Sequence, residues 1–326
     1  MTSPHFRRFG HVILAIGLLG LLIWQISSQE DLLKTWSEFK SMDFTKNIFY
    51  LILALLLMPI NWGIEIIKWK NLVSTIDKIT GRQSTYAVLT GISMGIVTPA
   101  RIGEYIGRLS VLTPEKRPPG VVLMFINSLA QNIINIFFGI FGILYFLDDY
   151  YQFDDVKLNQ YFVAVCLLSI LLISLYFNIR KVVAVTQKLP LPLFLQRWFK
   201  KLDLIQNVSN KSLVETGIYS LVRYFVYFLQ YCMILKFFNL DLGISQMMAG
   251  IATIFMVQSG IPLPPLSAIL ARGEIALMVW GMYNLSVSGI LAATFTLWVI
   301  NLIIPALFGI AIILFTDYNS NSYEND

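Results

Sequence analysis

The sequence predicts an all-α integral membrane protein with six full transmembrane spans and two re-entrant or broken-helix hairpins, arranged as an inverted repeat. Three observations lead to this fold class. Hydrophobic residues make up 56% of the 326 residues and charged residues only 13%, against roughly 25% charge in a soluble domain. Uncharged runs as long as a bilayer recur along the chain. The charges of the loops between these runs assign each loop to one side of the membrane. Those assignments agree only if two segments enter and leave the membrane on the same side, as hairpins do.

Crossing a bilayer as a helix takes about 20 apolar residues. The last uncharged run, 275–316, is far longer than that, so we expect it to turn at 281–284 before crossing. The first run follows two arginines and no small-x-small cleavage site comes after it, so we interpret it as an uncleaved anchor. Besides the last run, the predicted spans are 9–26, 47–67, 119–147, 158–179 and 212–235.

The loop charges set the predicted topology. Residues 180–211 carry seven cations and one acid, which favours the cytoplasm, whereas the loop at 148–157 carries four aspartates and one lysine, which favours the outside. These sides agree only if residues 83–116 enter and leave the membrane from the cytoplasm. By the same argument, residues 242–286 enter and leave from the outside. Both chain termini are then expected in the cytoplasm.

The result is a single polytopic membrane domain over 1–326 in which a span, a hairpin and a span occur twice with opposite orientation. In transporters, such inverted repeats place the substrate site near the bilayer midplane, on broken helices. The five predicted parts are an N-terminal anchor with an outer loop (1–46), the first repeat (47–147), an acidic outer loop with a span and a basic cytoplasmic loop (148–212), the second repeat (213–316) and a polar tail (317–326).

Several functional classes are excluded by composition. The two histidines, His5 and His11, lie at the N-terminus, which excludes histidine-dependent metallopeptidases and hydrolases acting at membrane depth. Cys166 and Cys232 lie inside apolar runs and offer neither a disulfide framework nor a zinc site. We therefore expect no enzyme activity, no metal and no cofactor. The net charge of +5 sits in particular loops and indicates topology, not nucleic-acid binding. The acidic loop at 148–157 is interpreted as solvated rather than as a magnesium site.

The first hairpin contains the strongest candidate binding site. Thr98 is a good N-cap and Pro99 a good first helical residue, so we expect a half-helix to begin at 98–99. Its free N–H groups and Arg101 would together favour a phosphate. Arg101, Glu104 and Arg108 are spaced to share one helix face. The alternative interpretation is an interfacial helix whose arginines extend to water.

The second hairpin repeats this pattern, with three prolines between residues 262 and 265 followed by Arg272 and Glu274. Charges inside such an apolar setting need partners. The alternative is a structural Arg272–Glu274 cluster that fixes the hairpin.

An inverted repeat brings its two hairpins together, which predicts ion pairs between them. We expect Arg272 near Glu104, and Glu274 near Arg101 or Arg223.

Other polar residues inside the spans are weaker candidates. Glu65 shares a helix face with Asn61 and Lys68, although Lys68 and Trp69 have the pattern of interfacial anchors. Arg223 lies at least one turn inside its span. A stripe of amides at i, i+4 and i+8 follows one uncharged helix, and such amides more often join helices than bind ligands. The stripe is Asn127, Gln131 and Asn135.

The run Thr98-Pro99-Ala100-Arg101-Ile102-Gly103-Glu104 resembles the Pro-x-Arg-x-Gly-Glu element of a flippase-like family, which includes the transmembrane region of bacterial lysylphosphatidylglycerol synthases. The segment 262–274 resembles that family's second, proline-rich element ending in Glu, although Leu266-Ser267-Ala268 stands where glycines are usual. The resemblance covers almost the whole chain. It implies lipid translocation in the bacterial cytoplasmic membrane. The synthases' soluble aminoacyl-transferase domain is not expected, because the chain ends ten residues after the last apolar run.

The leading hypothesis is a non-enzymatic translocase for a membrane phospholipid or a polyprenyl-phosphate-type lipid. Its headgroup would meet Arg101 from the cytoplasmic side and Arg272 from the outside. The alternative is a membrane-embedded accessory protein that binds lipid, or a partner enzyme, without transport. A small-solute transporter ranks third. The sequence leaves the lipid, the direction of transport, its energy source and the oligomeric state open.

Overall fold

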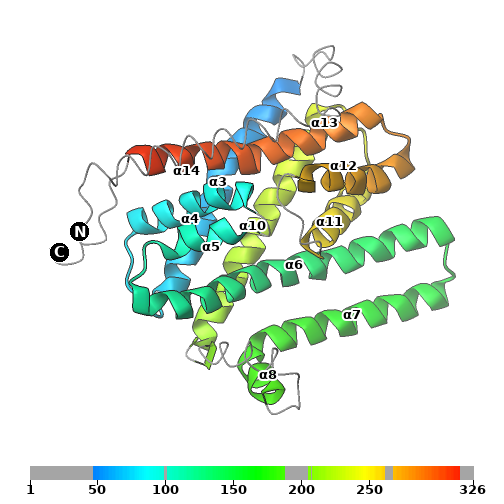
Figure 1. Cartoon of the computed structure of the whole chain (residues 1–326). Helices are drawn as coiled ribbons and strands as arrows, with labels where there is room; N and C mark the ends of the chain where they lie inside the picture. The colour runs from blue at the N-terminus through cyan, green and yellow to red at the C-terminus, as the bar shows by residue number, and fades with distance from the viewer. Residues whose placement is uncertain (1–46, 99–100, 188–204, 207, 261–266, 316–326) are drawn as a thin grey trace.

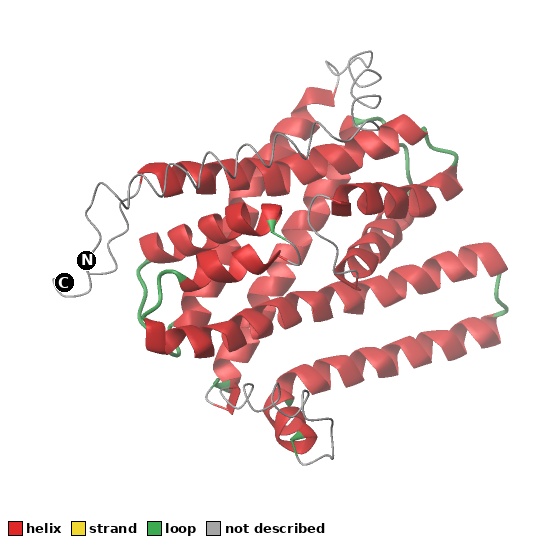
Figure 2. Cartoon of the chain, in the orientation of Figure 1, coloured by secondary structure: helices red, strands yellow, loops and turns green. Residues whose placement is uncertain are grey.

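A computed structural model describes residues 47–98, 101–187, 205–206, 208–260 and 267–315. Its regular secondary structure over these residues is entirely helical (Figure 2). The helices pack along one another as a bundle, with α7 on its outer edge (Figure 1). The all-α class expected from composition is therefore confirmed for the described part of the chain.

Five helices in the described residues are long and apolar enough to cross a membrane, by length and composition. Each matches a predicted span. The sixth predicted span, residues 9–26, lies outside the described residues. The five are α3 (Ile48–Val73), the run Pro114–Asp149 formed by η3 (Pro114–Lys116) and most of α6 (Arg117–Tyr151), α7 (Asp155–Phe177), α10 (Asn210–Phe237), and Val287–Phe315, which comprises α13 (Val287–Trp298), the π-helical turn η6 (Val299–Ile303) and α14 (Ile304–Phe315).

The two segments predicted as hairpins each contain a pair of short helices. The first pair is α4 (Gly81–Val97) and α5 (Ile102–Leu109). The second is α11 (Ile244–Gly260) and α12 (Ser267–Trp280). The three prolines expected to break the second pair lie outside the described residues.

Glycines let α5 lie very close to α4. A Cβ on Gly103 would come within 2.2 Å of the carbonyl oxygen of Met94, and one on Gly107 within 2.4 Å of the amide nitrogen of Gly91. Residues 103 and 107 are one helical turn apart, so they form the small-residue stripe that lets backbones approach inside membranes. The two helices therefore run antiparallel, and α5 presents its other faces away from α4.

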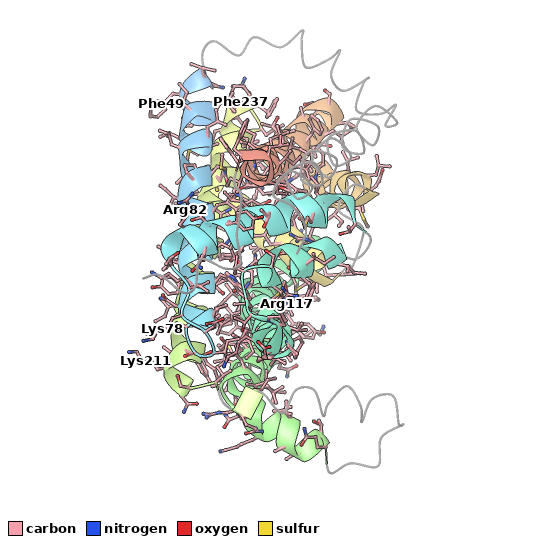
Figure 3. All side chains as sticks on the ribbon, turned by 60° about the vertical axis from the view of Figure 1, so that its left-hand side comes forward. Phe49, Lys78, Arg82, Arg117, Lys211 and Phe237 are labelled. Atoms are coloured by element: carbon pink, nitrogen blue, oxygen red, sulfur yellow. The ribbon has the colours of Figure 1, made fainter. Side chains whose placement is uncertain are left out.

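The central contact of the bundle is the antiparallel pair α3 and α10. Asn47, at the start of α3, donates a hydrogen bond to the carbonyl of Lys236 (3.2 Å), and Asn71, near its end, donates one to Tyr219 (3.2 Å). Figure 3 shows Phe49 and Phe237 at one end of this pair and Lys78 and Lys211 towards the other.

Each hairpin packs against a long helix from the other half of the sequence. In the first hairpin, Ser93 of α4 donates a hydrogen bond to the carbonyl of Ala306 in α14 (2.7 Å). In the second, α11 packs on α6, where a Cβ on Gly142 would come within 2.5 Å of the carbonyl oxygen of Ala249. The core accordingly forms two main clusters. One surrounds Trp69 and Ile92 and the other surrounds Trp280.

Two turns connect the remaining long helices. The expected turn at 281–284 is confirmed, because η5 (Gly281–Tyr283) is followed by Asn284 with φ of 55°. At the acidic loop, Asp154 accepts a hydrogen bond from the backbone N–H of Lys157 (2.8 Å) and caps α7. That bond holds the pKa of Asp154 below its usual range. Beyond α7 lies the short helix α8 (Ile179–Thr186).

Replacing Gly107 by Ala should lower stability by about 1–3 kcal/mol, because the new methyl group would press on the backbone of α4. Gly63→Ala is the matched control, since a Cβ there meets nothing within 4 Å and alanine favours a helix by about 1 kcal/mol. Thermal unfolding of both variants in detergent would measure the difference. A Gly107→Ala protein as stable as the control would contradict the close α4–α5 contact.

Candidate functional site

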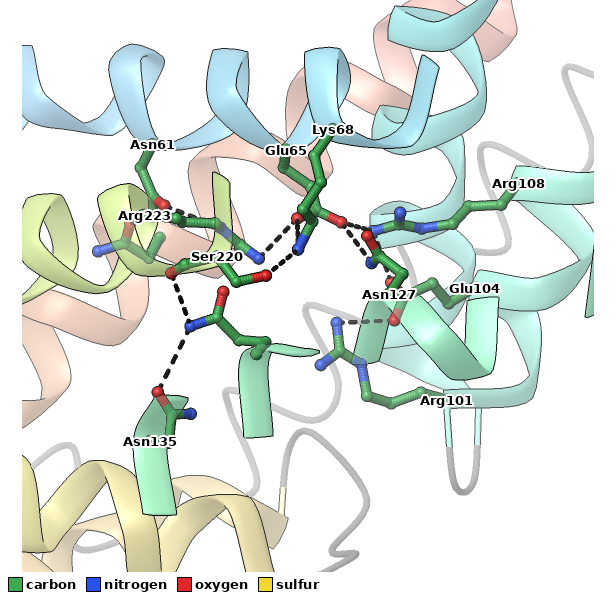
Figure 4. A network of polar contacts seen from close by, with 12 residues as sticks. Asn61, Glu65, Lys68, Arg101, Glu104, Arg108, Asn127, Asn135, Ser220 and Arg223 are labelled. Atoms are coloured by element: carbon green, nitrogen blue, oxygen red, sulfur yellow. Dashed lines mark hydrogen bonds and ion pairs between the residues drawn. The ribbon is translucent and has the colours of Figure 1, made fainter. Parts of the chain in front are cut away.

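The candidate site is built around Glu65, a carboxylate only 1% exposed on α3. Its Oε1 accepts from Arg108 Nη2 (2.8 Å) and Asn127 Nδ2 (2.9 Å). Its Oε2 accepts from Arg223 Nη1 (2.9 Å) and Lys68 Nζ (3.0 Å). These partners come from α5, α6, α10 and α3 itself, as Figure 4 shows. One buried side chain thus ties four helices together.

Lys68 and Trp69 are not the interfacial anchors that their pattern favoured. The Lys68 side chain is 0% exposed and also donates to Ser220 Oγ of α10 (3.3 Å), and Trp69 is fully buried. The reason is that α10 and α4 cover this end of α3. A lysine at such depth needs an anion, and Glu65 supplies it.

The face of α5 predicted to carry Arg101, Glu104 and Arg108 is confirmed. Glu104 bridges the two arginines, with Oε2 2.9 Å from Arg101 Nη2 and Oε1 2.9 Å from Arg108 Nη2. Arg108 then continues to Glu65, so the ion pairs form an unbroken series from α5 to α10. Arg108 is 3% exposed, whereas Arg101 is 45% exposed at the outer end of the series.

The expected helix start at 98–99 stays a prediction, because Pro99 and Ala100 lie outside the described residues. The backbone N–H of Arg101 does donate to the carbonyl of Thr98 (3.2 Å). Helix α5 begins at Ile102, and its N-cap is Arg101 in a left-handed conformation with φ of 56°. Thr98 is also the C-cap residue of α4. Thr98 Oγ1 nevertheless accepts from the backbone N–H of Gly103 (2.8 Å), so it satisfies one free donor of α5 from farther back. Thr98 therefore caps α5 with its side chain, although it lies outside that helix.

Two tryptophans on α3, Trp62 and Trp69, extend the site. From the sequence, Trp69 was interpreted as an interfacial anchor and neither tryptophan was predicted to lie in the site. The Arg223 guanidinium lies over the Trp62 ring, 4.9 Å from its centroid, and that of Arg108 lies over Trp69 at 5.4 Å. Trp62 and Trp69 flank Glu65 at i−3 and i+4, a spacing that places all three on one helix face. That spacing was the available signal. The rings stabilise the guanidinium groups by cation–π attraction.

A second branch leads from Arg223 into the C-terminal helices. Arg223 Nε donates to Asn61 Oδ1 (2.9 Å), and Asn61 Nδ2 donates to Asn301 Oδ1 (3.1 Å). Asn301 donates in turn to Gln230 Oε1 (2.8 Å). Asn301 lies in the π-helical turn η6, a feature often found at functional positions. This branch was not predictable from the sequence, because a π turn leaves no composition signal.

The amide stripe on α6 joins helices, as the more conservative interpretation expected. Asn127 contacts Glu65 as above. Gln131 Nε2 donates to the carbonyl of Ser220 (3.4 Å), and Asn135 Nδ2 donates to Ser259 Oγ (2.6 Å). The stripe therefore links the site to α10 and to the end of α11. The side-chain oxygens of Asn127 and Gln131 are buried without a hydrogen-bond partner.

The ion pairs predicted between the two hairpins are wrong. Glu104 is held by the arginines of its own helix, and Arg223 is held by Glu65. Glu274 is exposed on α12 and joins no ion pair among the described residues. Both oxygens of Glu104 are already paired within its own segment, at i, i+3 and i, i+4 spacing, so neither is left for a residue of the other hairpin.

Arg272 does approach the first hairpin, although without a carboxylate. It interacts electrostatically with Arg101 and with the phenol of Tyr227 on α10, and with no carboxylate of the described residues. Two arginines, one from each hairpin, are therefore close enough to interact electrostatically.

The site carries more positive than negative charge. Four cations, Lys68, Arg101, Arg108 and Arg223, are linked through two carboxylates, Glu65 and Glu104. Such an excess is costly in an apolar bundle unless an anion or water offsets it. No group of three or more His, Cys, Asp or Glu side chains in the described residues could hold a metal ion. The arrangement therefore suits an anionic ligand.

The family of the chain agrees with this geometry. Residues 12–315 match the family model described as "Lysylphosphatidylglycerol synthase TM region". The chain therefore belongs to that family, and the resemblance seen in its Pro-x-Arg-x-Gly-Glu element is confirmed. Comparison with curated proteins and with solved structures found no match. The family and the apolar helices together indicate a multi-pass membrane protein with a lipid-related function.

Glu65→Gln should destabilise the protein by about 3–5 kcal/mol, because it leaves Lys68, Arg108 and Arg223 without their shared anion. Glu215→Gln is the matched control, since Glu215 lies 3.9 Å from an exposed Lys211 and makes a weak surface pair. Thermal unfolding in detergent would compare the two. Equal stability of both variants would show that Glu65 is not the structural centre of the site.

Proposed function

We propose that the protein moves a phosphate-bearing lipid between the leaflets of the bacterial cytoplasmic membrane. The observation that carries this proposal is the positively charged ion-pair network inside an apolar bundle, which ends at the half-exposed Arg101. Charged groups inside a membrane bundle are costly and are usually retained for a function. Membership of a lipid-related family supports the same conclusion.

Arg101 has the properties of a headgroup receptor. One guanidinium nitrogen, Nη2, bonds Glu104, and the side chain is otherwise 45% exposed. A guanidinium binds phosphate oxygens through two parallel hydrogen bonds. Its left-handed backbone holds it at the N-terminus of α5, where helix N–H groups also favour an anion. Ile102 and Ile106 are exposed beside it, an apolar surface suited to acyl chains.

The route between leaflets would follow the polar side chains that join the two hairpins. Arg272 lies close enough to Arg101 to interact with it, and Gln131 and Asn135 connect the network to the end of α11. The headgroup would pass along these groups while the acyl chains stay in the surrounding lipid. No step of this route needs a cofactor or a covalent reaction, so we propose a transporter and not an enzyme.

We propose that the helices form an inverted repeat of six spans and two re-entrant hairpins, with both termini in the cytoplasm. The reciprocal packing supports this arrangement, because α4 of the first half packs on α14 and α11 of the second half packs on α6. The α3–α10 pair would lie on the pseudo-twofold axis. Lys78 and Lys211 lie towards the same end of that pair (Figure 3), as the positive-inside rule requires of a cytoplasmic side.

Cysteine labelling tests this topology. With Cys166 and Cys232 replaced by serine, single cysteines at the exposed positions Lys78, Lys116 and Gln152 should react selectively. We expect positions 78 and 116 to be labelled from the cytoplasm only, and position 152 from the outside only. Labelling of 78 and 116 from opposite sides would mean that the α4–α5 hairpin crosses the membrane, and the inverted repeat would have to be abandoned.

Arg101→Ala should lower lipid transport at least about tenfold, since a charge-assisted hydrogen bond to phosphate is worth about 1.5–3 kcal/mol. Arg101→Lys should retain part of the activity, because lysine keeps the charge but loses the paired hydrogen bonds. Lys157→Ala is the control, being an exposed cation that pairs only with its helix cap. Dithionite reduction of fluorescent phospholipids in proteoliposomes measures the rate.

The same assay separates transport from the accessory role. Equal reduction with and without protein, across phospholipids and polyprenyl phosphates, would contradict a translocase. Lipid binding that persists without transport would then favour an accessory protein. Full activity of Arg101→Ala would exclude Arg101 as the headgroup site and leave the translocase itself standing.

A further inference from the structure

The carboxylate oxygens of the site are all occupied. Both oxygens of Glu65 accept from cations, and Oε1 also accepts from Asn127. Each oxygen of Glu104 accepts from one arginine of α5. A ligand ammonium would therefore have to displace an arginine or a lysine to reach a carboxylate here. Displacement would leave that cation unpaired inside the bundle, at a cost that a surface site would not impose.

Guanidinium donors, by contrast, remain unpaired, and the only unpaired acceptors among the described side chains of the network are two neutral amide oxygens, those of Asn127 and Gln131. Arg108 is 3% exposed, and its Nε and Nη1 have no hydrogen-bond partner. Arg101 uses one nitrogen for Glu104. Arg272 has Arg101 and Tyr227 as its electrostatic neighbours and no carboxylate among the described residues. Arg101 is 45% exposed and can meet a ligand, whereas the free nitrogens of Arg108 are buried behind it. An exposed guanidinium next to saturated carboxylates favours an anion.

Glu274 does not correct this imbalance. It is separated from Arg272 by one residue on α12, which places the two side chains about 160° apart around the helix axis. Gly273 between them faces Leu291 of α13, and Glu274 is exposed. The carboxylate therefore lies away from the side on which Arg272 approaches Arg101.

We infer that the site selects lipid headgroups with net negative charge and no amine, such as the phosphate esters phosphatidylglycerol and polyprenyl phosphate, and rejects headgroups that carry an ammonium. This inference rests on the proposed lipid function and names its substrate class. Selection works in both directions, because the guanidinium groups attract the phosphate while an ammonium beside them meets like charge and no free carboxylate. An aminoacylated glycerophospholipid would therefore be a poor ligand for this chain.

Phosphatidylglycerol and lysylphosphatidylglycerol are a matched pair of probes, because they differ only in the lysyl ester. Their binding to the detergent-solubilised full chain can be compared by native mass spectrometry, with phosphatidylethanolamine as the zwitterionic probe. We expect phosphatidylglycerol to bind at least about tenfold more tightly than either amine-bearing lipid, in line with one charge-assisted contact. Arg101→Gln and Arg272→Gln should each reduce this preference for phosphatidylglycerol over the amine-bearing lipids. Lys157→Gln should leave it unchanged.

Acyl-labelled phosphatidylglycerol and phosphatidylethanolamine in proteoliposomes separate this inference from the proposed function. Transport of both lipids at equal rates, or equal binding of the three probes, would overturn the charge selection and leave a translocase. Preferential binding of phosphatidylglycerol without transport of any probe would support the selection and overturn the translocase. Arg272 carries no ion pair and Arg101 is half-exposed, so both glutamine variants should keep the wild-type melting temperature.

Discussion

The buried carboxylate of Glu65 is the constraint on which the rest of the site depends. Three cations from three helices, Lys68, Arg108 and Arg223, converge on its two oxygens inside an apolar bundle. Each cation would be costly at this depth without that anion. The side chain therefore dictates how α5 and α10 sit against α3, and the glycines of α5 provide the close approach to α4 that brings Arg108 within reach.

The hairpin α4–α5 is consequently held by two kinds of interaction, close packing on one face of α5 and ion pairs on another. Gly103 and Gly107 pack against the backbone of α4 by shape. Glu104 and Arg108, on another face, connect to the buried charges. Arg101 alone extends outward, and its left-handed backbone is a conformation that non-glycine residues adopt at a cost. A fixed helix with one exposed guanidinium is the geometry of a preorganised receptor, in which the ordering cost is met during folding and not on binding.

Composition and hydrophobic run length were enough to predict the five described spans, since both are properties of contiguous sequence. The shared face of Arg101, Glu104 and Arg108 was also predictable, because i, i+3 and i+7 spacing is local. Which residues contact each other across helices was not predictable. Lys68 and Trp69 have the pattern of interfacial anchors, and only the packing of α10 and α4 over that end of α3 makes them buried. The predicted Arg272–Glu104 pair is absent for a different reason, because Glu104 pairs locally with Arg101 and Arg108.

The arrangement of the ion pairs separates a structural part from an exchangeable part. Glu104 accepts from Arg108 through one oxygen and from Arg101 through the other. If a phosphate displaced Glu104 from Arg101, the Arg108 contact would still neutralise Glu104, and the links to Glu65 would be untouched. The outermost pair can therefore open without exposing an unpaired charge in the interior, whereas breaking any pair at Glu65 would. Ligand exchange at Arg101 is thus compatible with a rigid core, and a headgroup that binds the open form better will shift the population towards it.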